Sequence, residues 1–171
     1  MLIRDRSNME KAMSITYKDI VLQRIEMDQK YQKRKALLQT EAGKLVKEYS
    51  DSLKIPADKW HDGEREQSFV RTGITNAAGN FERRPVRASQ LDDKYRVNFI
   101  LSTAVNTDVS GGEWIYVPVS VWMNNGYINV SINNGTHELT IANGDDEGRY
   151  LEAATLLKQQ VMLAILEPDL E

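Results

Sequence analysis

The chain contains no cysteine among its 171 residues. A disulfide framework, a cysteine-based zinc site and a thiol nucleophile are therefore excluded, and the composition is compatible with a reducing compartment. Histidine is scarce, with two in the chain. Neither His61 nor His137 stands in a metal-ligand motif, and no nucleophile-elbow or phosphate-loop glycine pattern occurs. We therefore expect no enzyme activity, no metal and no cofactor.

Long apolar runs are also absent. No segment approaches the roughly 20 apolar residues that cross a bilayer, and residues 1–13 lack the apolar centre of a signal peptide. With 41% hydrophobic and 27% charged residues, the composition is that of an ordinary globular protein. We expect a protein of the cytoplasm that does not contact membranes.

The charges are unevenly distributed along the chain. Residues 1–60 hold 13 Lys and Arg against 9 Asp and Glu, whereas residues 106–171 hold 2 against 10. A basic first part and an acidic last part favour head-to-tail attraction, within one chain or between copies. Uneven solvation with no partner explains the same distribution.

The strongest pattern is a pair of Asn-Gly dipeptides, at residues 125–126 and 134–135, between runs rich in Val and Ile. Asn-Gly favours a type I′ turn, which joins antiparallel strands through a two-residue loop. Two such turns fix the register, and almost every cross-strand set is then apolar. The predicted pairs are Met123 with Ile128, Val121 with Val130, Val119 with Ile132, Ile132 with His137, Val130 with Leu139, and Ile128 with Ile141.

Helical patterns flank the predicted sheet. Thr16 and Asp19 have the spacing of a capping box, and good helix formers continue to about Ser52. Apolar residues return at spacings of four and three from Leu38 onward, which is weak support for a coiled coil and a helix-mediated homodimer. A second helix is predicted from about Glu147, capped by Asp145 or Asp146. Its apolar face holds Leu151, Ala154, Leu157, Val161, Ala164 and Ile165.

Together these patterns predict an α+β fold: a long N-terminal helix, an antiparallel meander sheet of five to six strands, and a C-terminal helix packed on the aliphatic sheet face. We expect a frayed or flexible segment over residues 1–14, the long helix over 15–53, and a linker over 54–65 with one helical turn between Pro56 and Trp60. The sheet and closing helix occupy residues 66–171. Further strands are predicted at 69–74, 81–88 and 95–105.

The other face of the sheet is the candidate binding surface. Its parity brings together Trp114, Tyr116, Trp122 and Asn129, with Arg96 on the same side. This mixture is too polar for a hydrophobic core and too aromatic for a solvent-exposed face that binds nothing. Three interpretations stay open: the N-terminal helix covers the aromatic part, a protein partner binds it, or bases of a single-stranded nucleic acid stack on it.

Two arginines extend this surface. Arg83 and Arg87 share a face if residues 81–88 form one strand, and they could hold an acidic partner or phosphates. Charge that protects an edge strand against aggregation is the alternative explanation.

The sequence does not name a function by itself. We expect a non-catalytic protein-binding module, such as an adaptor, chaperone or inhibitor, that uses the aromatic sheet face, the long helix or both. The alternative is a single-stranded nucleic-acid-binding protein.

Overall fold

The computed structural model describes residues 2–166 and 170. They fall into two compact units, Met1–Arg34 and Lys35–Glu171, and the division lies inside the second helix. The first unit holds α1 (Leu2–Met13) and the first half of α2 (Tyr17–Ser52). At the start of α2, the backbone N–H of Thr16 donates to the Asp19 carboxylate (2.8 Å), and the Asp19 N–H donates back to the Thr16 hydroxyl (3.3 Å). The predicted capping box is confirmed.

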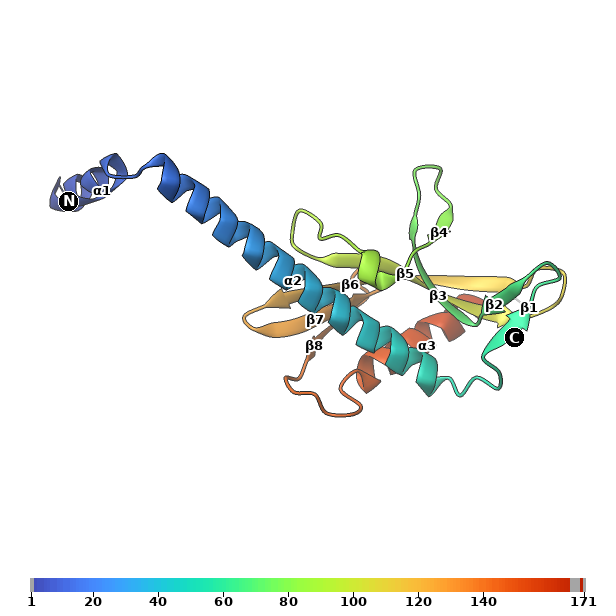
Figure 1. Ribbon diagram of the computed structural model, residues 1–171. Coiled ribbons are helices and arrows are strands. Elements are labelled where there is room, and N and C mark those ends of the chain that lie inside the picture. The colour runs from blue at the N-terminus through green and yellow to red at the C-terminus, as the bar shows by residue number, and fades with distance from the viewer. Residues whose placement is uncertain (1, 167–169, 171) are drawn as a thin grey trace. The chain divides into compact units, whose positions relative to one another are not determined.

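The second unit contains a six-stranded antiparallel sheet in the order β4-β3-β5-β6-β7-β8 and a separate two-stranded hairpin, β1-β2. Figure 1 shows the β3–β4 hairpin extending beyond its neighbours, and the β1–β2 hairpin near the turn that joins β5 to β6. The bounds are β1 (Lys59–His61), β2 (Glu66–Ser68), β3 (Val70–Thr75), β4 (Phe81–Arg83), β5 (Val97–Asn106), β6 (Glu113–Asn124), β7 (Tyr127–Ile132) and β8 (His137–Ile141). The remaining elements are the 3₁₀ turn η1 (Val86–Ala88) and α3 (Leu151–Ile165).

The predicted register of the two Asn-Gly hairpins is confirmed pair by pair, from Met123 opposite Ile128 to Ile132 opposite His137. Asn125 and Gly126 have φ angles of 51° and 79°, as a type I′ turn requires. Asn134 and Gly135 likewise have φ angles of 53° and 85°. The local turn therefore determines which face each side chain of these three strands occupies.

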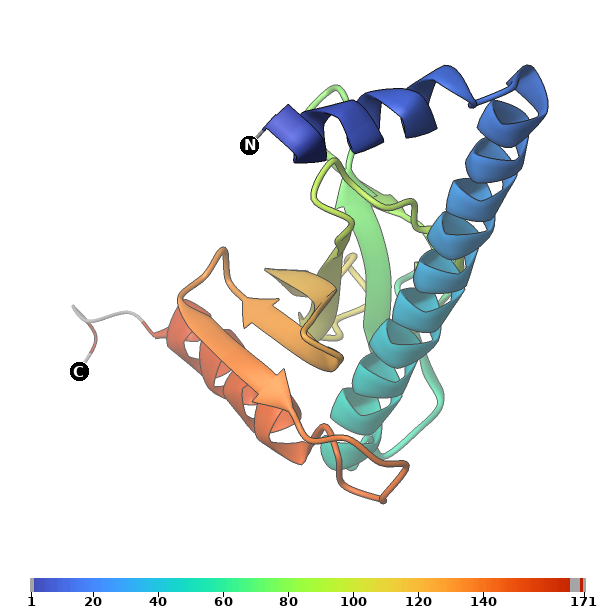
Figure 2. The same cartoon turned by 90° about the vertical axis from the view of Figure 1, so that its left-hand side faces the viewer.

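One face of the sheet carries the hydrophobic core. Both helices of this unit contribute to the core, and α3 packs against β6 and β7 (Figures 1 and 2). The Tyr49 hydroxyl, on the second half of α2, is 2.7 Å from the Thr103 hydroxyl of β5 on the same face. The buried aliphatic side chains of the strands and helices include Leu38, Ala42, Leu45, Val97, Leu101, Val119, Val121, Val130, Ile132, Ala154, Leu157 and Val161. The predicted α+β architecture is confirmed.

Several local predictions are wrong. Residues 38–49 of α2 pack in the aliphatic core of this chain, so the apolar spacing from Leu38 onward reflects internal packing and not a coiled coil, and this part of the helix does not cover the aromatic face. Strand β4 ends at Arg83, because Pro85 interrupts the ladder and η1 follows. Residues 59–61 form strand β1 in place of a helical turn. On α3, Ala154, Leu157 and Val161 are buried as predicted, but Leu151, Ala164 and Ile165 are exposed.

The start of α3 also differs from the prediction. The helix begins at Leu151 after an N-cap residue, Tyr150, which makes no side-chain cap hydrogen bond. Its backbone N–H instead donates to the Glu48 carboxylate of α2 (3.1 Å). A carboxylate at this position satisfies a free N–H and lies at the positive end of the helix dipole. The cap therefore comes from a distant helix and not from Asp145 or Asp146.

A buried carboxylate joins the same two helices. Glu41 accepts hydrogen bonds from the Tyr150 hydroxyl and from the Arg149 guanidinium (2.8 Å to Nη1). The Glu41 and Arg149 side chains are 6% and 12% exposed. Burial, and then the hydrogen bond to Glu41, raise the pKa of Tyr150 well above its ordinary value. This network holds the second half of α2 to the start of α3.

We predict that Arg149→Met destabilises the sheet unit by about 1.5–3 kcal/mol, because it removes a charged hydrogen-bond donor from the buried Glu41 carboxylate and leaves the half-exposed Lys44 (3.1 Å) as its remaining cation. Urea unfolding followed by tryptophan fluorescence measures the change, since Trp60, Trp114 and Trp122 all belong to this unit. Lys47→Met is the control, because the Lys47–Asp51 pair is exposed (77% and 65%) and should contribute little. Equal unfolding midpoints for the two variants would contradict a stabilising role of the network.

Candidate binding surface

The second face of the sheet carries the polar and aromatic side chains, and we call it the mixed face. The pairing of β3 with β5 and of β5 with β6 places alternate residues of each strand on it. Asn98 and Tyr116 are exposed there, and Trp122 and Asn129 are half-buried. Its members include Arg71, Gly73, Phe81, Arg83, Asn98, Ile100, Ser102, Trp114, Tyr116, Pro118, Ser120, Trp122, Asn129, Ser131, Glu138 and Thr140.

At one end of the mixed face an arginine lies over a tryptophan. The Arg96 guanidinium carbon is 4.1 Å from the centre of the Trp122 ring, and Trp122 is paired with Asn129 across β6 and β7. Such a stack buries apolar surface while the guanidinium keeps donors for a ligand. At this end the Arg96 guanidinium covers one face of the half-buried Trp122 ring, and a ligand would contact the ring at its edge.

Polar bonds fix the strands around this stack. The Ser120 hydroxyl donates to Asn98 Oδ1 (2.5 Å), and Asn98 Nδ2 donates to Asp92 (2.7 Å). Partial burial opposes ionisation of Asp92, but hydrogen bonds from the Arg96 N–H and the Asn98 amide keep its pKa below the ordinary value. The carboxylate is thus held ionised at the end of the loop that positions Arg96.

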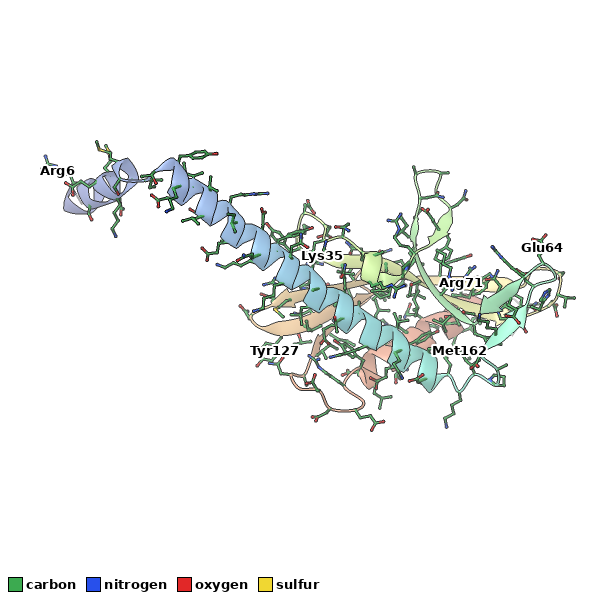
Figure 3. All side chains as sticks on the ribbon, in the orientation of Figure 1. Arg6, Lys35, Glu64, Arg71, Tyr127 and Met162 are labelled. Atoms are coloured by element: carbon green, nitrogen blue, oxygen red, sulfur yellow. The ribbon has the colours of Figure 1, made fainter. Side chains whose placement is uncertain are left out.

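At the other end, Arg71 of β3 lies between aromatic rings. Its guanidinium carbon is 3.4 Å from the centre of the Trp114 ring and 4.9 Å from that of Phe81. Phe81 in turn lies 5.1 Å from Tyr116, and Trp114 lies 5.7 Å from Trp60 of β1. Figure 3 shows Arg71 on β3. Rings from β1, β4 and β6 therefore hold one guanidinium in place.

Gly73 makes this cluster sterically feasible. It is buried on β3, directly opposite Arg83 of β4. A Cβ built on Gly73 would lie 2.6 Å from the Phe81 ring and 2.2 Å from the Glu82 carbonyl oxygen. The absence of a side chain at this position allows the Phe81 ring to lie across β3 beside Arg71.

Next to Arg71 is a hollow of about 240 Å³, which we call the arginine hollow. It is lined by Arg65, Glu66, Gln67, Arg71, Phe81 and Arg83. The turn that carries Arg65 is fixed by Asp62, whose carboxylate accepts from the N–H groups of Arg65 (2.8 Å) and Glu64 (2.9 Å). These bonds, and one from the Gln67 amide, lower the pKa of Asp62 to about 2.

Two other surfaces of the second unit are hollowed or apolar. A larger hollow of about 730 Å³ lies between residues 44–52 of α2 and residues 145–151, but the carboxylates of Glu48 and Asp51 there already accept bonds from within the fold. The outer side of α3, marked by Met162 in Figure 3, exposes Leu151, Met162 and Ile165. Neither surface brings a cluster of arginines together with aromatic rings, as the mixed face does.

The predicted site residues separate into three groups. Arg96, Trp122 and Asn129 come together at one end of the mixed face. Trp114 and Tyr116 belong to the aromatic cluster at the other end, beside Arg83. Arg87 lies apart from both, in η1, so the expectation that it shares a strand face with Arg83 is wrong.

Sequence reasoning missed Arg65, Arg71 and Phe81. The alternation within β3 already placed Arg71 and Gly73 on one face, but no short turn links β3 to β5, so their common register could not be assigned. The Nε2 atom of His137 lies 3.0 Å from the Gln160 amide nitrogen. Within residues 2–166, no three His, Asp or Glu side chains gather closely enough to hold a metal ion.

Comparisons with known proteins give no family. No family model matches the chain, and neither a curated protein nor a solved structure is similar enough to count as a match. In the part of the chain that the structure describes, no helix has the length and apolarity of a membrane span.

We predict that Gly73→Ala destabilises the sheet unit by about 1–3 kcal/mol, the usual range for overpacking, because the new Cβ meets the Glu82 carbonyl and the Phe81 ring. Gly43→Ala is the matched control: a Cβ there meets nothing within 4 Å, and helix propensity favours alanine by about 1 kcal/mol. The two changes should therefore shift the urea midpoint in opposite directions. A Gly73→Ala variant as stable as the parent would contradict the packing of Phe81 over β3.

Proposed function

We propose that this chain is a cytoplasmic protein-binding module, such as an adaptor, chaperone or inhibitor, that binds an acidic segment of a partner on the mixed face. The observation that carries the proposal is the asymmetry of the sheet. Two helices bury its aliphatic face, whereas Tyr116 and Asn98 on the other face are exposed. Aromatic side chains and arginine are the residues enriched where proteins bind one another.

The charge of the mixed face favours an acidic partner. Arg65, Arg71, Arg83 and Arg96 lie on it or at its border. Its acidic groups include Glu66 in the arginine hollow, the exposed Glu138 of β8, and Asp92, which is already bonded by Asn98 and by the loop backbone, so the four arginines outnumber them. An acidic peptide would therefore meet net positive charge, which both attracts and orients it.

The stacking of arginine on both tryptophan rings of the mixed face favours a protein partner over nucleic acid. Arg71 lies over Trp114 and Arg96 lies over Trp122. A base that stacks on a tryptophan needs a ring face, and in both tryptophans one face is occupied by a guanidinium. Protein side chains need only the ring edge and the arginine donors.

Site-specific photocrosslinking tests the proposal. With a benzophenone amino acid at Ser120, on the mixed face, we expect a discrete covalent partner from cell lysate. The same group at Gln159, exposed on α3, should give none. Arg96→Glu should abolish the product, whereas Arg87→Glu, the same charge change in η1, should not. Equal crosslinking at both positions, or none at Ser120, would refute the proposal.

The competing function is tested in parallel with a fluorescent single-stranded oligonucleotide. Salt-dependent binding that is lost in Arg83→Glu would assign the face to nucleic acid, and we expect no binding at low salt.

We also propose that the first unit mediates homodimer formation. Tyr17, Ile20 and Met27 are exposed along one side of α2, at spacings of three and seven residues that suit a helix–helix contact. Light scattering should give the mass of a dimer, and the double variant Ile20→Asp, Met27→Asp should give a monomer. Leu22→Asp is the control, because Leu22 is exposed on the opposite side of the helix. A monomeric parent chain would exclude this contact.

A further inference from the structure

The arginine hollow holds three guanidinium groups and one carboxylate. Arg71 comes from β3, Arg83 from β4 and Arg65 from the residue before β2. Glu66 is the acidic residue that lines the hollow. The formal charge of the lining groups is therefore strongly positive, in a chain whose net charge is −3.

These guanidinium groups are not neutralised by the fold. Among the residues that the structure describes, no carboxylate lies within 4.0 Å of a side-chain nitrogen of Arg65, Arg71 or Arg83; the pairs formed are those of Arg24, Lys30, Lys44, Lys47, Arg84 and Arg149. A half-buried arginine such as Arg71 is ordinarily paired. Here it shares the hollow with the exposed side chains of Arg65 and Arg83.

The lack of acceptors is clearest at Arg71. Its Nε atom is buried without a hydrogen-bond partner in the described structure, and its Nη2 has a long contact of 3.4 Å with the buried Ser102 hydroxyl. Burial is the main cause that lowers the pKa of this guanidinium; a hydrogen bond with the Tyr116 side chain opposes the shift, and the charges of Arg83 and Arg65 add to it to a lesser degree. An anion in the hollow would relieve both the repulsion and the unmade hydrogen bond.

The hollow is preorganised for a small ligand. Trp114 and Phe81 fix the Arg71 guanidinium from two sides, and the Asp62 turn fixes the backbone of Arg65. A held arginine loses little entropy when it forms hydrogen bonds. At about 240 Å³, the hollow is smaller than the roughly 300–1,000 Å³ of sites for drug-sized ligands, so it suits a single group.

We propose that the arginine hollow is a binding site for a tetrahedral oxyanion of charge −2, such as phosphate or a phosphomonoester group. Three guanidinium groups, partly offset by Glu66, match a dianion better than the single charge of a carboxylate. Planar guanidinium groups pair bidentately with phosphate oxygens. The site does not depend on the proposed protein partner, because it is defined by residues that can be tested with phosphate itself.

Isothermal titration of the full-length chain at pH 7.5 with inorganic phosphate and with phenyl phosphate tests the site, at ionic strength held constant with chloride. We expect saturable binding of both, tighter for phenyl phosphate because Phe81 lines the hollow. At pH 5, where a phosphomonoester carries mostly one negative charge, the affinity should fall. Acetate should bind much more weakly than phosphate.

Two variants at neighbouring positions, the last residue of β4 and the residue that follows it, locate the site. Arg83→Gln should weaken phosphate binding about tenfold or more, since a hydrogen bond to a charged group contributes about 1.5–3 kcal/mol. Arg84→Gln makes the same charge change on the next residue, whose side chain lies near Glu82 (3.9 Å), and should leave the affinity unchanged. Arg83 is exposed, so its variant should fold, and an unchanged urea midpoint confirms this.

The proposal is overturned by three results. No saturable heat with phosphate or phenyl phosphate would exclude the site. Equal weakening by both variants would show that phosphate associates with the basic edge in general. Acetate binding as tight as phosphate binding would make the ligand a carboxylate and refute the dianion assignment.

Discussion

The arrangement of the second unit depends on the hydrogen bonds that the Glu41 carboxylate accepts from the start of α3. The carboxylate is buried, and it is bonded both to the guanidinium of Arg149 and to the hydroxyl of Tyr150. A buried carboxylate is tolerated when its oxygens are bonded and its charge is matched, so the start of α3 is held where these donors can reach α2. Glu48 adds the helix cap from the same side of α2. As a result, both helices contribute to the core on one face of the sheet.

The mixed face replaces core packing with stacks of arginine on aromatic rings. Arg96 over Trp122 and Arg71 over Trp114 each shield a large ring while leaving charge at the surface. The short edge strand β4 carries Arg83 and is followed by Arg84 and Pro85, which oppose pairing with another sheet. The arginines that protect the face from non-specific association are therefore the same ones on which the proposed binding depends.

The parts of this fold that are predictable from sequence are those determined by local contacts. The Asn-Gly turns give the register of β6, β7 and β8, and the Thr16–Asp19 pair gives the start of α2, because all the atoms involved lie within a few residues. The start of α3 was not predictable: its cap comes from Glu48, 102 residues earlier. The arginine hollow was not predictable for the same reason, since β2 belongs to a separate two-stranded sheet and its approach to the β3–β4 hairpin depends on tertiary packing.

Arg149 and Arg71 are two partly buried arginines that the fold treats differently. Arg149 donates to a buried carboxylate at 2.8 Å, which is the usual solution for a cation in the interior. Arg71 contacts two rings, has a hydrogen bond with the Tyr116 side chain and a long one with the Ser102 hydroxyl, and lies near two like charges, but its Nε–H has no hydrogen-bond partner. A structural role as a cover for Trp114 explains the stacking, but a lysine or an apolar side chain would cover the ring without burying an unbonded N–H. An anion from outside the chain would explain both observations: it would accept a hydrogen bond from the Arg71 Nε–H, and it would account for Arg65 and Arg83 lining the same hollow.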